Sequence, residues 1–148
     1  MISVLITQMM PNINRRFGDT IQNGFFMRKK VTDMHEMGIA LQIVEVAQSS
    51  IPEEMKQSRV EKINLKIGRL AAVVPESLNL CMEVVTKDTP LEGAAIHIEE
   101  VPVIAKCRKC NHQWEVASAV YICPECKSIE LDIISGNELN VVSIDIAD

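Results

Sequence analysis

The sequence of 148 residues has few aromatic residues and no long hydrophobic run. Phe, Trp and Tyr make up 3% of it, and the three Phe all lie within residues 1–33, so the main core must be aliphatic. No apolar run approaches the roughly 20 residues of a membrane-spanning helix. The short apolar opening lacks the basic start of a signal peptide. We therefore expect a cytoplasmic protein with no membrane partner.

Common enzyme motifs and a basic surface are also missing. No phosphate-binding loop, dinucleotide fingerprint or Ser/His/Asp set appears. Residues 1–33 carry five Lys/Arg against two Asp, a balance of +3, so the net charge of −5 leaves −8 on residues 34–148. A nucleic-acid binder is expected to present a basic face. The sequence argues against an enzyme and against a nucleic-acid partner.

Two pairs of cysteines form the strongest local motif. Cys107 and Cys110 are separated by two residues, and so are Cys123 and Cys126. Two such turns facing each other supply the four sulfurs of a tetrahedral structural zinc site, with no position left for water. In the reducing cytoplasm, paired cysteines are metal ligands more often than disulfides. An iron-tetrathiolate electron carrier uses similar turns, and two thioredoxin-like redox pairs are a weaker alternative.

Other residues near this motif have two interpretations or a modest role. A glycine usually follows the second cysteine of such turns, but Asn111 and Lys127 stand there, and Asn tolerates the left-handed backbone better than Lys. His112 is either a solvated loop residue or a competing, titrating metal ligand. We expect Cys81 to be a small buried hydrophobe and His97 to face solvent.

The hydrophobic pattern predicts an α+β fold in which two helices pack on a three-stranded sheet. The first helix begins at Met37, and its inward face is formed by Met37, Ala40, Leu41, Val44 and Ala47. The second helix opens at Pro75, with Leu78, Cys81, Met82 and Val85 inward. Alternating residues predict strands at 60–67, 94–101 and 139–146. The cysteine segment is inserted between the last two strands.

We expect three regions. Residues 1–33 have no lasting periodicity and are predicted to be poorly ordered, or an artefact of an upstream start. Residues 34–102 and 135–148 form the α+β domain. Residues 103–134 form a zinc-binding domain, in which Trp114 and Val116 face Val120 and Ile122 as a hairpin of a zinc ribbon. About 30 residues cannot build a sufficient core, so the metal should supply much of its folding free energy.

A second site is indicated where Met34, His35 and Glu36 precede the first helix. This triplet is followed by an Ile67-Gly68 strand end, a Val74-Pro75-Glu76-Ser77-Leu78 helix start, the two cysteine turns and a final Gly136-Asn137-Glu138-Leu139 segment. The order resembles the HypA (also HybF) family of hydrogenase nickel-incorporation proteins, and the resemblance covers residues 34–148.

The resemblance implies that His35 binds Ni²⁺, with Met34 and Glu36 completing the site. A free α-amine, the His35 backbone nitrogen and its imidazole can form fused chelate rings, and such nitrogen donors suit square-planar Ni²⁺. The fourth ligand stays open between the Glu36 backbone, a water and another side chain. Because 33 residues precede Met34 and would leave it without a free amine, we expect translation to start at Met34.

The function implied is that of a non-enzymatic nickel metallochaperone with a structural zinc. It would deliver Ni²⁺ to the large, catalytic subunit of a [NiFe]-hydrogenase. The resemblance further implies a HypB-type GTPase as a partner, and a homodimer as one possible assembly. The alternative is a zinc-ribbon interaction module without nickel transfer.

Overall fold

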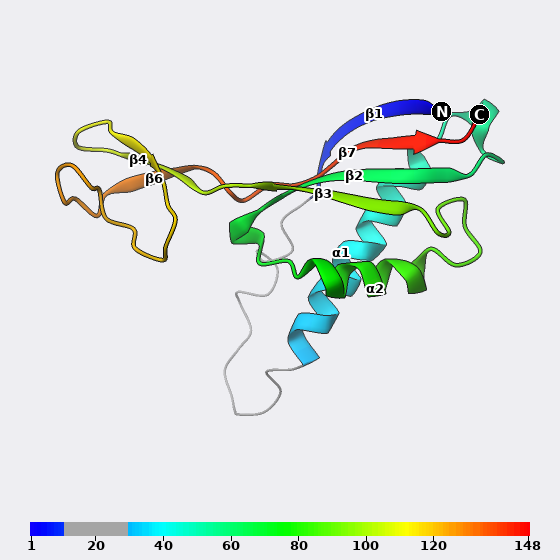
Figure 1. Cartoon of the computed structure of the whole chain (residues 1–148), viewed down its shortest axis with the longest axis horizontal. Helices are drawn as coiled ribbons and strands as arrows, with labels where there is room; N and C mark the ends of the chain where they lie inside the picture. The colour runs from blue at the N-terminus through cyan, green and yellow to red at the C-terminus, as the bar shows by residue number, and fades with distance from the viewer. Residues whose placement is uncertain (11–29) are drawn as a thin grey trace.

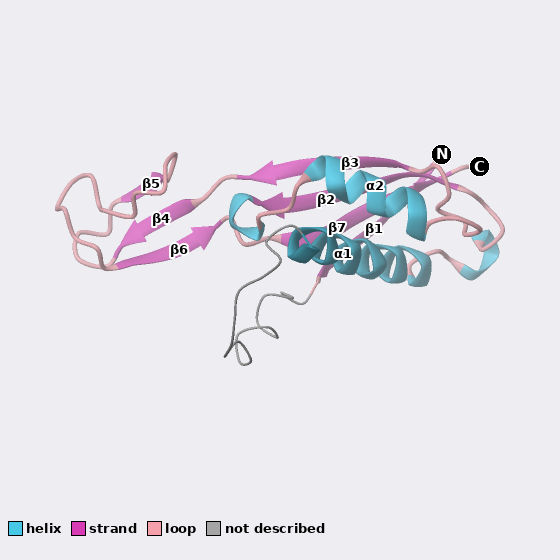
Figure 2. Cartoon of the chain, turned by 90° about the horizontal axis from the view of Figure 1, so that it is seen from below, coloured by secondary structure: helices cyan, strands magenta, loops and turns pink. Residues whose placement is uncertain are grey.

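The computed structural model describes residues 1–10 and 30–148. They form a four-stranded sheet covered on one face by the helices α1 and α2, and a three-stranded sheet that projects from one end (Figures 1 and 2). The smaller sheet is inserted between two strands of the larger one, as the cysteine segment predicted. The α+β class is therefore confirmed.

The larger sheet has the strand order β1-β7-β2-β3. Its three predicted strands are β2 (Val60–Gly68), β3 (Ala95–Val101) and β7 (Leu139–Ile146). β2 and β3 are parallel and are connected through α2, whereas β7 is antiparallel to β2. On β3, Ile96 and Ile98 pack against the core while His97 faces solvent, as predicted.

The fourth strand was not predicted. β1 (Ile2–Met9) runs antiparallel along the free edge of β7, with Ile2 opposite Ile146. Val4 and Ile6 pack against the main core, and Met10 is buried in it. The prediction of a poorly ordered N-terminal region is therefore wrong for residues 1–10, because their partner strand lies at the other end of the sequence. Residues 11–29 lie outside the described residues.

The first helix, α1 (Lys30–Ser49), begins earlier than predicted. Met34, His35 and Glu36 are consequently inside the helix and do not precede it. The inward face of α1 is formed by Ile39, Ala40, Ile43, Val44 and Ala47. Leu41 was predicted on this face but is 55% exposed. It is two residues from both Ile39 and Ile43, about 200° around the helix from either, so it points away from the sheet.

The second helix, α2 (Pro75–Val85), matches its prediction closely. Leu78 and Met82 are buried, and Cys81 and Val85 pack half-buried against the same core. Among the described residues, the buried part of this core consists of Ile, Leu, Val, Ala and Met side chains. The expected aliphatic core is thus confirmed.

The two sheets are joined where Gly68, at the end of β2, lies against Gly136, in the segment between β6 and β7. The Gly68 amide donates to the Glu138 carbonyl and the Leu70 amide donates to the Gly136 carbonyl, both at 2.8 Å. A Cβ on Gly68 would lie 2.0 Å from the Gly136 oxygen. Only glycine at position 68 permits this approach, which sets how the smaller sheet joins the larger one.

The turn after β2 fixes the smaller sheet further. In the 3₁₀ turn Arg69–Ala71, Arg69 donates from Nε to Glu100 at 2.6 Å and from Nη1 to Glu115 at 3.1 Å. Leu70 packs against the small core of the inserted part. The turn therefore follows directly from β2 of the larger sheet and contacts both the larger and the smaller sheet.

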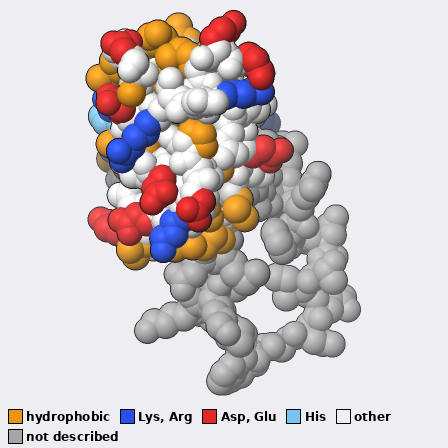
Figure 3. Space-filling view, turned by 90° about the vertical axis from the view of Figure 1, so that its right-hand side faces the viewer, with side chains coloured by type: hydrophobic (Ala, Val, Ile, Leu, Met, Phe, Trp, Pro, Cys, Tyr) orange, Lys and Arg blue, Asp and Glu red, His pale blue; other side chains and the backbone are white. Residues whose placement is uncertain are grey.

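The described surface carries charges of both signs. At the end of the molecule where the two termini lie, acidic, basic and apolar side chains alternate without a region of one sign (Figure 3). In the part of the chain that the structure describes, no helix has the length and apolar character needed to cross a bilayer.

Candidate metal centres

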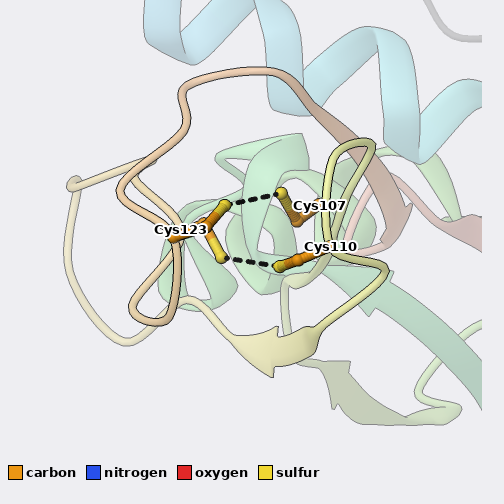
Figure 4. A group of neighbouring side chains, drawn as sticks. Cys107, Cys110 and Cys123 are labelled. Atoms are coloured by element: carbon orange, nitrogen blue, oxygen red, sulfur yellow. Dashed lines mark hydrogen bonds between the residues drawn. The ribbon is translucent and has the colours of Figure 1, made fainter.

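The four cysteines of the inserted part converge on one point. The sulfur atoms of Cys107, Cys110, Cys123 and Cys126 all lie within 4.8 Å of one another. Cys107 and Cys126 are separated by 3.5 Å, as are Cys110 and Cys123, and the labelled thiols point toward each other (Figure 4). Four sulfurs at the zinc–sulfur distance of about 2.3 Å stand about 3.8 Å apart in a tetrahedron. The cluster therefore fits a four-coordinate metal ion.

Both cysteine turns have the same backbone geometry. In the first, the Cys107 amide donates to the His112 carbonyl at 2.9 Å and the Asn111 amide donates to the Cys107 carbonyl at 3.0 Å. In the second, the Cys123 amide donates to the Ser128 carbonyl at 2.9 Å and the Lys127 amide donates to the Cys123 carbonyl at 3.0 Å. Asn111 has φ 60° and Lys127 has φ 61°, both left-handed. The position expected to favour glycine thus has the conformation that glycine adopts most easily.

The thiols do not all ionise unless a cation is present. The amide of Cys110 is the main cause that lowers the pKa of Cys107 to about 6. At Cys110 the His112 amide lowers the pKa, but desolvation and the other thiols outweigh it and raise the pKa to about 12. At Cys126 the Ser128 amide lowers the pKa, and the Cys107 thiol with desolvation raises it above its usual value. A bound cation would favour the thiolate form of all four sulfurs, against the desolvation and the contacts between thiols that raise these pKa values.

The strands around the cluster differ from the prediction. β4 (Ile104–Cys107) enters the first turn, β5 (Gln113–Glu115) leaves it, and β6 (Leu131–Ser135) follows the second turn. Trp114 pairs with Ala105 of β4, so the predicted hairpin between residues 114–116 and 120–122 is wrong. The cysteine turn itself acts as the hairpin connection. It brings β4 and β5 together locally, whereas Val120 and Ile122 stay exposed.

Contacts outside the thiol cluster hold the first turn in place. Arg108 donates to Asp132 of β6 at 2.8 Å from Nε, and it lowers the pKa of that carboxyl group. Lys109 forms an ion pair with Glu130 at 3.3 Å. The ring of His112 stacks on Trp114, with centroids 6.0 Å apart. His112 is therefore half-buried beside Trp114 and is not one of the four converging ligand side chains.

The residues of the second predicted site occupy one turn of α1. His35 is half-buried and Glu36 is fully buried, while the side chain of Met34 lies outside the description. The Glu36 carboxylate accepts a hydrogen bond from the Val74 amide at 3.1 Å. Sequence reasoning missed this contact, because it joins α1 to the residue before α2, which is distant in the sequence. The four cysteines are the one group of three or more potential ligand side chains that converges among the described residues.

The fold and the thiol cluster define a small α+β metal-binding protein with an inserted four-cysteine module. A family model described as "Hydrogenase/urease nickel incorporation, metallochaperone, hypA" matches residues 34–146. The chain belongs to this HypA family of nickel-incorporation metallochaperones.

Similar proteins agree with the assignment. A hydrogenase maturation factor HypA of Desulfosudis oleivorans is 50% identical over 113 residues, which cover 76% of this chain and 98% of that protein. One of Desulfatibacillum aliphaticivorans is 51% identical over 115 residues, covering 78% and 88%. The solution structure of the Ni metallochaperone HypA from Helicobacter pylori has a TM-score of 0.55 at 18% identity, covering 75% of this chain and 96% of that one. The last comparison supports the fold.

Proposed function

We propose that this chain carries Ni²⁺ for [NiFe]-hydrogenase maturation, binding it at Met34, His35 and Glu36, and holds a structural Zn²⁺ on its four cysteines. The observation that carries the proposal is the family match, which begins at Met34. The protein thereby acts as a metal carrier and not as an enzyme. Its two metals have different tasks, because the two sites differ in accessibility and donor type.

The thiol cluster suits a resident metal better than a cargo. Its four sulfurs fill a tetrahedral coordination shell, and two of the four cysteines, Cys107 and Cys123, are buried. A closed site of this kind releases metal slowly and leaves no open position for a water molecule. Nickel that must be handed on requires a site with fewer protein ligands, and nitrogen donors at a chain terminus provide one.

The helix geometry supports nickel binding by a chain that begins at Met34. In the 148-residue chain α1 starts at Lys30, so the backbone nitrogens of Met34, His35 and Glu36 come after the first turn. There each N–H is expected to bond the carbonyl four residues earlier. In a helix that starts at Met34, the first four N–H groups have no such partner. A chain beginning at Met34 therefore leaves the amine and adjacent amides available to the ion.

Nickel titration of a chain that begins at Met34 tests this function. We expect one tightly bound Ni²⁺ per chain, loss of that binding in His35→Ala, and unchanged zinc content. His97→Ala is the matched control, because His97 is exposed on β3. The 148-residue chain should bind nickel more weakly, because the backbone nitrogen of Met34 is then part of a peptide bond and is not a free amine. Retained stoichiometric binding in His35→Ala would contradict the assignment.

The proposed partners follow from the same role. We expect a HypB-type GTPase and the hydrogenase large subunit to contact the protein in the cytoplasm, and a homodimer to be tested by mass in solution. The alternative, a zinc-ribbon interaction module without nickel transfer, requires the cysteine module alone. A chain that begins at Met34, keeps its zinc and binds no nickel would favour that alternative.

A further inference from the structure

Glu36 is an ionisable residue in an unusual position. It is 0% exposed, whereas the preceding His35 is half-buried. Its Oε1 accepts a hydrogen bond from the Val74 amide at 3.1 Å. Its Oε2 is also buried and has no hydrogen-bond partner among the described residues. Carboxylates are rarely buried to this extent unless a specific contact requires it.

That contact lies at the start of the second helix. Val74 is the residue before the first turn of α2, and its own side chain provides no cap. Pro75 follows and has no amide hydrogen to offer. The Glu36 carboxylate therefore takes the place of a capping acceptor, supplied by α1 across the helix pair. The positive end of the α2 dipole favours a carboxylate there.

The same geometry separates Glu36 from the imidazole of His35. Successive residues on a helix point about 100° apart, and side chains at i and i+1 do not face each other. Glu36 is turned toward α2, and one of its oxygens already accepts a hydrogen bond. A nickel ion bound by the His35 ring is therefore out of reach of this carboxylate while both contacts persist.

We infer that the Glu36 side chain is a positioning residue for nickel binding and not a nickel ligand. By bonding the Val74 amide, its carboxylate fixes the turn of α1 that carries His35 against the start of α2. The nitrogen donors at Met34 and His35 are then held in place before the ion arrives. This inference rests on the proposed nickel site and concerns the Glu36 side chain alone, so the Glu36 backbone nitrogen remains a candidate fourth ligand.

Three substitutions of Glu36 test the assignment in a chain that begins at Met34. Glu36→Gln keeps an oxygen acceptor of the same length but removes the charge. Glu36→Asp keeps the charge but is too short to reach Val74. Glu36→Ala removes both. Glu45→Ala is the matched control, because Glu45 is an exposed carboxylate on the same helix. Each variant is titrated with Ni²⁺ alone, and its zinc content is measured.

A positioning role gives a distinctive order of affinities. Glu36→Gln should stay within about threefold of the unsubstituted chain, whereas Glu36→Asp and Glu36→Ala should lose about 10- to 100-fold, as for other residues that orient metal ligands. The absorption spectrum of the nickel complex at saturation should be unchanged throughout. Hydrogen exchange at the Val74 amide should remain slow in Glu36→Gln and become fast in Glu36→Asp.

Opposite results overturn the inference. If Glu36→Gln loses nickel and changes its spectrum while Glu36→Asp keeps both, the carboxylate is a ligand. If Glu36→Ala binds like Glu45→Ala, the residue has no part in nickel binding. Should Glu36→Ala fail to fold, the Gln and Asp pair still decides the question. The unsubstituted chain is titrated before any variant, and absence of nickel binding in it would overturn the proposed function as well.

Discussion

The substitution Gly68→Ala tests how the two parts of the molecule are joined. Gly68 has φ −74° and ψ 148°, a conformation that alanine adopts freely. On backbone grounds alone the change should stabilise the protein slightly, because alanine has less freedom in the unfolded chain. The new Cβ, however, would lie 2.0 Å from the Gly136 oxygen and 2.7 Å from the Asn137 nitrogen. Both contacts are with backbone, which has little room to move.

The expected cost follows from what must give way. Separating the two strands breaks the hydrogen bonds from Gly68 to Glu138 and from Leu70 to Gly136, at about 1 kcal/mol each. Overpacking adds about 1–3 kcal/mol. We therefore expect Gly68→Ala to lower the free energy of unfolding by about 3–5 kcal/mol in total.

Urea denaturation of the metal-loaded protein, followed by far-ultraviolet circular dichroism, measures this change in the free energy of unfolding. Ala72→Gly is the matched control, since Ala72 lies in the same loop with φ 53°. This substitution places glycine where alanine has a left-handed backbone conformation. It should leave the free energy of unfolding unchanged or raise it by up to about 1 kcal/mol. A loss of less than about 1 kcal/mol in Gly68→Ala would refute the close approach on which the reasoning depends.

Three further predictions concern the cysteine module. Chelation of the bound metal should unfold residues 103–134 and expose Trp114 to solvent while the helical circular dichroism persists, because the core of the module has three buried aliphatic residues, Val103, Ala105 and Val116. Unchanged Trp114 emission after complete metal removal would contradict this. Metal affinity should rise with pH through neutrality. An unfolded cysteine has a pKa of about 8.5, and the folded cluster raises the pKa of Cys110 and Cys126 further. Both thiols are therefore protonated at pH 7 with or without folding, and metal binding must release at least these two protons. Calorimetry in buffers of different ionisation enthalpy counts the protons, and fewer than two would argue against a four-thiolate site. Lys127→Gly should stabilise the metal-loaded module by about 1 kcal/mol against thermal unfolding, because it removes the strain of a lysine in the left-handed conformation at φ 61°. A large loss of stability would mean that the hydrogen bond from Lys127 to the Pro124 carbonyl at 2.8 Å contributes more than the backbone strain costs.

Much of the fold and one metal site could be predicted from local patterns. Strands β2, β3 and β7 follow from alternating residues, and the start of α2 follows from Pro75. The cysteine cluster was predictable because each turn is local and its spacing sets two sulfurs on one side. The second site was harder to define. Its identity came from the resemblance, while the surroundings of Glu36 depend on Val74, which lies on the other side of the helix pair.

What the sequence alone determined is therefore what short stretches of chain encode: the α+β class, the aliphatic core, the inserted module and the four sulfur ligands. Tertiary structure decided the contacts between segments far apart in the chain. It paired β1 with β7, placed Leu70 in the module core, brought Gly68 against Gly136 and buried Glu36. These contacts depend on which surfaces meet in the folded chain. A periodicity or motif within one segment does not specify which distant segment it will contact.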